Sequence, residues 1–193
     1  MKVILASQSP RRRELLSMLR IPFEVEVSGE KEQIPPHAAP EKVVMALARQ
    51  KAAHVFKTHP DSCVIGSDTI VVLGEEILGK PASHEEAAEY LQRLQGQSHR
   101  VLTGLCVLSP KGEKVGYDAA HVRFAPMEKE EIDWYVSTGD PMDKAGAYGI
   151  QGDACCFVEG ITGNYFTVMG LPLPLLYRFL RELGIVDARR TLI

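Results

Sequence analysis

The sequence predicts a mixed α/β fold in which strands and helices surround one long, twisted sheet. Apolar runs typical of buried strands, such as "KVILA" at residues 2–6, occur among segments whose apolar residues recur at helical spacing. These segments do not follow the regular strand–helix alternation of an all-parallel sheet, which favours a mixed one. At 193 residues, the chain is long enough for one sizeable core or two small lobes, and we expect a single domain over residues 1–193.

In residues 1–57, the sequence predicts two strands and two helices. Pro10 suits the first turn of a helix, and Ser9 is a plausible N-cap before it. "FEVEV" at 23–27 alternates and predicts a half-exposed strand, and the proline-rich stretch after it predicts a loop. From residue 40 to 57, apolar residues recur at the spacing of a helix.

The remaining elements follow in order along the chain. Residues 63–80 predict a strand, a Gly-Glu hairpin turn and a short second strand. Ser83 and Glu86 resemble a capping box that opens a helix ending near Gly96. The later predictions are strands at 100–109 and 120–126, a helix at 128–138, an irregular glycine-rich stretch, a short strand at 155–160 and a helix at 171–183.

Composition excludes several classes of function. The net charge of −3 argues against a general affinity for nucleic acid or anionic membranes. No apolar run approaches the ~20 residues of a membrane span, and the apolar start is too short for a secretory signal. The four cysteines form no C-x-x-C motif, so we expect reduced, buried thiols in a cytoplasmic protein. The histidines show no metal-ligand spacing and are expected at the surface.

Three arginines follow Pro10 at the start of the first predicted helix. Cations are unfavourable at a helix N-terminus unless an anion joins them. Arg12 shares the face of Leu15 and Leu16, so it lies on the core side of the helix mouth. Ser7 and the free N–H groups of the first turn could hold a phosphate beside it. The alternative is a basic cap in contact with water.

Two further regions carry groups that could do chemistry. Asp68 lies within a strongly apolar predicted strand, where a carboxylate must be paired, hydrogen-bonded or bound to metal. It is either a general base, a ligand of a hard cation, or a structural residue at a turn. Lys80 before a proline and the glycine-rich loop at 143–152 are weaker signals, compatible with a surface lysine and a flexible loop.

Together these stretches resemble the Maf family of nucleoside triphosphate pyrophosphatases. The matching segments are "LASQSPRRRELL", "ALARQKA", "GSDT", "LGKP", "DKAGAYGIQG" and "VMGLP". The resemblance implies an elongated mixed sheet flanked by helices, with two lobes and a central cleft, similar to inosine triphosphate pyrophosphatases. It also implies hydrolysis of a nucleoside triphosphate to monophosphate and pyrophosphate, aided by a divalent metal cation, Mg²⁺ or Mn²⁺.

The resemblance also assigns site residues. The catalytic acid falls on Asp68, and the metal ligands on Asp68 and Glu32. The substrate-binding positions are Ser7, Arg12, Arg13, Glu32, Lys51, Thr69, Lys80, Asp143, Lys144 and Gln151. Whether Asp68 binds the metal, deprotonates water or does both stays open.

The base specificity rests on Arg12, Thr69 and Gln151, which resemble the branch of the family that prefers dTTP and UTP. The alternatives are the same chemistry on 7-methyl-GTP or a non-standard purine, and a nucleotide-binding regulator of septum formation. The apolar segment "LPLPLLYRFL" belongs either to a homodimer interface or to a core helix.

Overall fold

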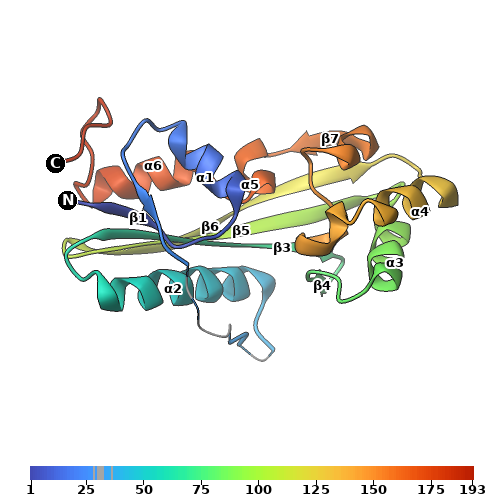
Figure 1. The fold of residues 1–193 in the computed structure, drawn as a ribbon, viewed down its shortest axis with the longest axis horizontal. Helices are drawn as coiled ribbons and strands as arrows, with labels where there is room; N and C mark the ends of the chain where they lie inside the picture. Colours follow the sequence, from blue (N-terminus) through green and yellow to red (C-terminus); the bar gives the residue numbers. More distant parts are fainter. Residues whose placement is uncertain (28, 30–32, 36) are drawn as a thin grey trace. The chain divides into compact units, whose positions relative to one another are not determined.

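A computed structural model describes residues 1–27, 29, 33–35 and 37–193 and has a mixed α/β fold (Figure 1). The strands are β1 (Val3–Leu5), β2 (Glu24–Val25), β3 (Cys63–Leu73), β4 (Glu76–Leu78), β5 (Ser98–Ser109), β6 (Gly112–Phe124) and β7 (Val158–Thr162). They form one sheet in the order β2-β1-β3-β5-β6-β7, with β4 paired to β3. β1 is parallel to β2 and β3, whereas β4 and β7 pair antiparallel with their neighbours. The predicted mixed sheet is therefore confirmed.

Helices account for most of the remaining chain. The α-helices are α1 (Pro10–Ser17), α2 (Pro40–Thr58), α3 (His84–Leu94), α4 (Lys129–Ser137), α5 (Tyr165–Met169) and α6 (Leu173–Glu182). Three 3₁₀ helices are η1 (Asp140–Asp143), η2 (Ala145–Ala147) and η3 (Asp153–Phe157). Across the described ranges, none of the helices is both long enough and apolar enough to cross a membrane.

The chain divides into two compact units that are discontinuous in sequence. Unit 1 comprises Met1–Asp68, Thr103–Asp118 and Gly170–Ile193. Unit 2 comprises Thr69–Leu102 and Ala119–Met169. The boundary between Asp68 and Thr69 falls inside β3, so two of the predicted site residues are consecutive in the chain but belong to different units.

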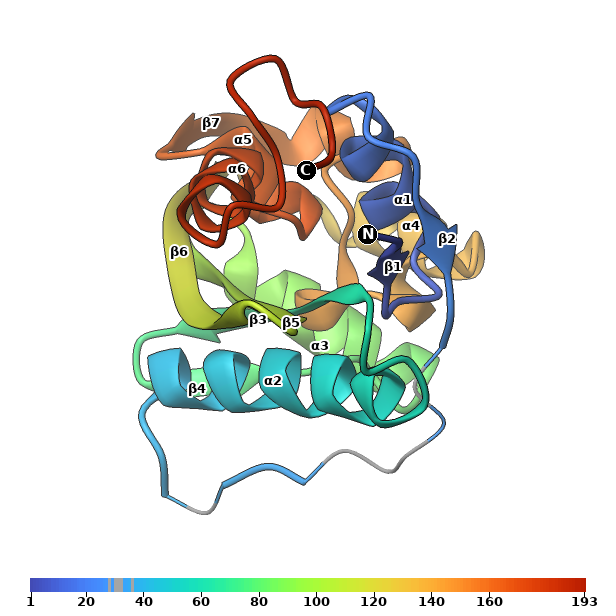
Figure 2. The same ribbon diagram turned by 90° about the vertical axis from the view of Figure 1, so that its left-hand side faces the viewer.

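In unit 1, α2 packs closely against β3 and β5 (Figure 2). A Cβ atom on Gly66 would lie 2.2 Å from the Ala48 carbonyl oxygen, and one on Gly104 would lie 2.1 Å from that of Val44. Glycine at these two positions allows the helix backbone to touch the sheet. Buried side chains of β1, α2, β3 and β5 fill the contact: Ile4, Ala6, Ala48, Ala52, Val55, Val64 and Cys106.

The last helix of unit 1, α6, contributes its apolar face to the core. Leu173, Leu176, Phe179 and Leu180 are buried. Phe179 lies so close to β6 that a Cβ on Gly116 would meet its ring at 3.0 Å. These four residues of "LPLPLLYRFL" pack within the unit, whereas Leu175 and Tyr177 of the same segment are partly exposed.

Unit 2 has its own hydrophobic core. The packing of α3 against α4 and η2 encloses it. Its largest buried side chains include Leu78, Leu91, Leu94, Phe124 and Tyr135. The glycine-rich stretch after α4, which was predicted to lack regular structure, instead forms η1 and η2. It belongs to this packed core.

Several local predictions need correction. The strand at 23–27 shrinks to Glu24–Val25, which is an edge strand with both residues exposed. The strand predicted at 155–160 starts only at Val158, since the preceding residues form η3. Cys155 and Cys156 consequently lie on an exposed turn, whereas Cys63 and Cys106 are buried, and all four are free thiols.

One histidine prediction is also wrong. His99 is 2% exposed rather than at the surface. It packs edge-on against Phe124 and Tyr148, with ring centroids 5.2 and 5.3 Å away, and its Nε2 lies 2.7 Å from the Tyr148 hydroxyl. His99 lies near the start of β5, and its contacts with Phe124 and Tyr148, which are distant in the sequence, bury it.

Candidate active site

Two serines and an arginine form a hydrogen-bonded group at the N-terminus of α1, which we call the mouth of the helix. Ser9 is the N-cap, and its hydroxyl accepts from the Arg12 N–H at 3.5 Å. Ser7 is 7% exposed, and its hydroxyl accepts from the Ser9 N–H at 3.2 Å and from Arg12 Nη1 at 3.3 Å. The predicted helix start is confirmed. The Arg12 guanidinium is held back over the first turn, where the helix dipole and the N–H groups favour an anion.

In addition to its contact with Ser7, the Arg12 guanidinium contacts a backbone carbonyl oxygen. Arg12 Nε donates to the Gly170 carbonyl at 2.8 Å. The Ser67 hydroxyl, which is fully buried, lies 2.9 Å from the same oxygen and 2.9 Å from that of Gly104. Gly170 has a φ of 101°, which favours glycine. Sequence reasoning missed Ser67 and Gly170, although both lie within quoted motifs, "GSDT" and "VMGLP".

Asp68 and Lys51 form an ion pair inside unit 1. Lys51 extends from α2, and its Nζ donates to Asp68 Oδ1 on β3. The side chains are 17% and 12% exposed, so water screens their attraction weakly. This pairing offsets the cost of placing a carboxylate in an apolar strand. The structure thus brings together two residues that the sequence predicted separately.

Two other predicted site residues belong to the N-terminal part of the chain, Arg13 and Glu32. Arg13 is exposed beside Arg12 on the outer surface of α1. Glu32 lies outside the described residues. Of the predicted site residues in unit 1, the structure pairs Ser7 with Arg12 and Lys51 with Asp68.

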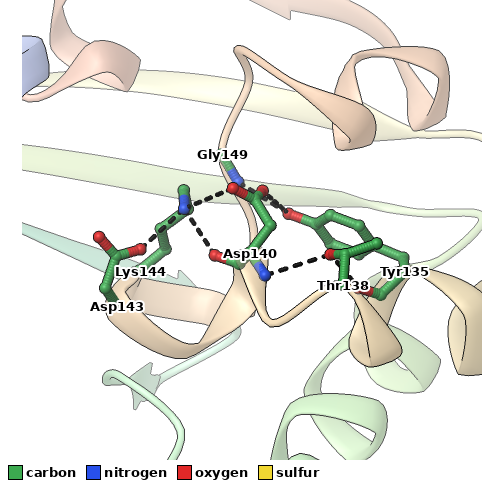
Figure 3. A network of polar contacts seen from close by, with 6 residues as sticks. All are labelled: Tyr135, Thr138, Asp140, Asp143, Lys144 and Gly149. Atoms are coloured by element: carbon green, nitrogen blue, oxygen red, sulfur yellow. Dashed lines mark hydrogen bonds and ion pairs between the residues drawn. The ribbon is translucent and has the colours of Figure 1, made fainter.

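In unit 2, Lys144 lies at the centre of a polar network (Figure 3). Lys144 is 8% exposed. Its Nζ donates to the Asp140 carbonyl at 2.5 Å, to Asp140 Oδ1 at 2.9 Å and to Asp143 Oδ1 at 2.7 Å. The Tyr135 hydroxyl donates to Asp140 Oδ2 at 2.8 Å. Burial and this carboxylate both raise the pKa of Tyr135, so its hydroxyl remains a donor.

Two motif segments of unit 2 are in direct contact. The Gly146 N–H donates to the Gly79 carbonyl at 2.9 Å, so the loop holding Lys144 is tied to the residue before Lys80. Gly146 has a φ of 68°, and a Cβ there would collide with Val71 at 2.7 Å. The glycine-rich loop is therefore shaped by packing. Lys80 and Gln151 are exposed, and Thr69 is partly buried at the start of the unit.

The metal that the resemblance implies has one predicted ligand at a described position, Asp68. Outside positions 28, 30–32 and 36, no three His, Cys, Asp or Glu side chains are grouped to hold a metal ion. Mg²⁺ in nucleotide enzymes commonly uses only one or two carboxylates, and phosphates and water supply the other oxygen ligands. Asp68 provides one such carboxylate at a buried position.

The family model and the curated relatives point to one family, and a solved structure matches the fold. A family model described as Maf-like protein matches residues 2–183. A protein of Aquifex aeolicus (strain VF5) named dTTP/UTP pyrophosphatase is 48% identical over 96% of this chain and 97% of its own. A Bacillus cytotoxicus protein of the same name is 48% identical over 94% of this chain and 95% of its own. The structure of the Staphylococcus aureus Ham1 protein matches with a TM-score of 0.53 at 15% identity, over 94% of this chain and 99% of that one. That likeness concerns the fold.

Proposed function

Because the chain belongs to the Maf family, we propose that it hydrolyses nucleoside triphosphates, preferring dTTP and UTP, to the monophosphate and pyrophosphate. The observation that carries the proposal is the buried pair of Asp68 and Lys51. It stands in the same unit as the serine- and arginine-lined mouth of α1. Relatives at 45–48% identity that are named dTTP/UTP pyrophosphatases support the substrate class.

In the proposed reaction, cationic side chains bind the phosphates and one carboxylate accepts a proton. A triphosphate carries close to four negative charges, and most of what phosphoryl chemistry asks of a protein is positioning and electrostatic stabilisation. Arg12, Arg13, Lys51, Lys80 and Lys144 supply positive charge. Asp68 accepts the proton of the attacking water, and Ser7 and the N–H groups of α1 hold phosphate oxygens.

A divalent cation would be held by Asp68, with Glu32 as the second carboxylate. When bound, Mg²⁺ or Mn²⁺ neutralises phosphate charge and orients the phosphates. Activity is expected to vanish on thorough chelation with EDTA and to return with either ion. Full activity after chelation would refute the metal requirement while leaving the assignment of the substrate intact.

The preference for a pyrimidine base is assigned to Arg12, Thr69 and Gln151. Uracil and thymine are neutral and present a carbonyl acceptor beside an N3–H donor. The exposed amide of Gln151 offers one donor and one acceptor to match them. A 7-methylguanine ring is cationic and would be repelled by Arg12, and the 4-amino group of cytosine reverses one hydrogen-bonding edge. Asp143 completes the substrate-binding set as a partner of Lys144.

The test is a comparison of kcat/KM for dTTP, UTP, CTP and 7-methyl-GTP, with pyrophosphate identified as a product. We expect dTTP and UTP to lead and CTP to be weaker. Polar mismatches that leave buried groups unpaired can reach ~10⁴-fold discrimination. A preference for 7-methyl-GTP or a purine would overturn the roles given to the three base-recognition residues. Release of inorganic phosphate without pyrophosphate would overturn the reaction.

A further inference from the structure

The ammonium group of Lys144 has a defined set of acceptors. A lysine ammonium offers three N–H donors, and three protein oxygens lie within 2.9 Å of Lys144 Nζ. Two of the three belong to Asp140, its carbonyl and its Oδ1. The third belongs to Asp143, whose side chain is 69% exposed, compared with 31% for Asp140. The inner contacts of Lys144 are thus made by Asp140, and the outer contact by Asp143.

Asp140 is itself held from the opposite side. Tyr135 is fully buried on α4, and its hydroxyl donates to Asp140 Oδ2 while accepting from the Gly149 N–H at 3.4 Å. The Asp140 N–H donates to the Thr138 hydroxyl at 3.1 Å, which in turn donates to the Tyr135 carbonyl at 2.7 Å. The chain of contacts runs from the end of α4 to Lys144 (Figure 3). Each oxygen of the Asp140 carboxylate therefore has a different partner.

From this arrangement we infer that Asp140 is a positioning residue for Lys144, and that Tyr135 orients Asp140 for this task. The inference rests on the proposed function, in which Lys144 binds substrate phosphates. A lysine side chain has four rotatable bonds, and fixing it in advance removes an entropic cost from binding. The contact of Lys144 with the exposed Asp143 is the one open to solvent, so a phosphate oxygen approaches the ammonium on the side of Asp143.

The packing around the lysine stem supports the same role. A Cβ atom on Gly149 would lie 2.6 Å from Lys144 Cε and 2.8 Å from Cδ. The stem therefore lies directly over the glycine backbone, and only a residue without a side chain leaves room for it. The contact of the stem with Gly149 and the hydrogen bonds that the ammonium donates to Asp140 together favour one position of the ammonium.

The experiment is a double-mutant cycle between Asp140→Asn and Lys144→Gln. KM for dTTP and the Kd of a non-hydrolysable dTTP analogue are measured for each single variant and for the pair. If Asp140 acts through Lys144, Asp140→Asn raises KM and Kd about tenfold, because the amide has one acceptor oxygen and cannot serve both the Lys144 ammonium and the Tyr135 hydroxyl. In the Lys144→Gln background, the same substitution has no further effect. Glu159→Gln is the matched control, since it removes a carboxylate from an exposed ion pair of the same unit.

Each outcome bears on the inference. Equal effects of Asp140→Asn in both backgrounds would mean a purely structural role and would overturn it, as would an unchanged KM. Should Asp140→Asn fail to fold, Tyr135→Phe replaces it in the cycle, because it keeps the ring that packs against Phe157 and removes only the hydroxyl. A wild-type enzyme that hydrolyses dTTP while Lys144→Gln leaves KM and Kd unchanged would refute this inference and the substrate-binding role of Lys144, and would leave the proposed reaction intact. A wild type without pyrophosphatase activity would refute the proposed function.

Discussion

Lys51 on α2 and Asp68 on β3 are joined by a direct hydrogen bond between ammonium and carboxylate in the largely buried interior of unit 1. The strand that holds Asp68 is mostly apolar, and Val64, Ile65 and Ser67 on it are fully buried. Removing one partner of such a pair leaves an uncompensated buried charge, which is strongly destabilising. A variant of Asp68 must therefore keep its shape and polarity in order to test chemistry and not folding.

We predict that Asp68→Asn folds and lowers kcat for dTTP by at least ~10²-fold, the lower end for losing a general acid–base group. The amide is isosteric and still offers an oxygen to Lys51, but it cannot accept a proton from water. Steady-state kinetics measure kcat, and thermal unfolding of the same sample shows whether the variant is folded. Asp61→Asn, at an exposed position just before β3, is the control. Near-normal turnover of a folded Asp68→Asn enzyme would exclude the catalytic assignment.

Gly149→Ala should impair substrate binding more than stability. The new methyl group would meet Lys144 Cε and Cδ, which belong to a flexible stem and can move aside. Moving the stem withdraws the ammonium from Asp140, so KM for dTTP is expected to rise about tenfold, the loss of one hydrogen bond to a charged group. Gly160→Ala in β7 is the matched control, because nothing lies within 4 Å of its added carbon. A large fall in unfolding temperature with unchanged KM would contradict the expectation.

The fold was predictable where local chemistry and packing agree. Ser9 and Pro10 define the start of α1, and the apolar spacing defines α2, since both signals are contained within one helix. The start of β7 and the exposure of Cys155 were not predictable, because apolar residues at 154–158 fit a strand and a 3₁₀ turn equally well. The choice depends on Ala154 and Phe157, which point into the core of unit 2.

The candidate site was predictable in its residue types and less so in its partners. A carboxylate in an apolar strand indicated that Asp68 needs a counter-charge, but nothing in the spacing indicated that Lys51 supplies it. The partner comes from a helix 17 positions earlier, brought there by the contact of Gly66 and Gly104 with α2. Ser67 and Asp140 were missed for the same reason, because their roles depend on Gly170 and Lys144 contacts made only after folding.

Gly104→Ala should destabilise the protein strongly. Its Cβ would lie 2.1 Å from the Val44 carbonyl oxygen and 2.4 Å from its carbon, which are backbone atoms of α2 that cannot rotate away. Overpacking of this kind costs about 1–3 kcal/mol, occasionally more, and we expect the upper end. Urea unfolding compares the variant with Gly79→Ala, where nothing lies within 4 Å of the added carbon. Equal midpoints for the two variants would show that α2 can shift without cost.

The last prediction concerns acid stability and arises from His99. Burial, and to a smaller degree the nearby His121, lower the pKa of His99 to about 4. Its Nδ1 is buried and has no hydrogen-bond partner among the described residues, so in the protonated ring, where both nitrogens are donors, the Nδ1–H would be unsatisfied. In the unfolded chain a histidine titrates near pH 6.5. Between these two values the unfolded state binds more protons, and stability therefore falls as the pH is lowered.

The size of this effect follows from the two pKa values. Above pH 6.5 the histidine is neutral in both states and contributes no pH dependence, whereas lowering the pH from 8 to 5 should remove roughly 2 kcal/mol of the free energy of unfolding. His99→Gln retains a polar partner for the Tyr148 hydroxyl and does not titrate. Urea denaturation of both proteins at pH 8 and pH 5 isolates the contribution, because all other groups titrate alike. The variant should lose about 2 kcal/mol less than the wild type over this range. An identical loss in both would mean that protonated His99 is accommodated in the core, against the geometry of its aromatic neighbours.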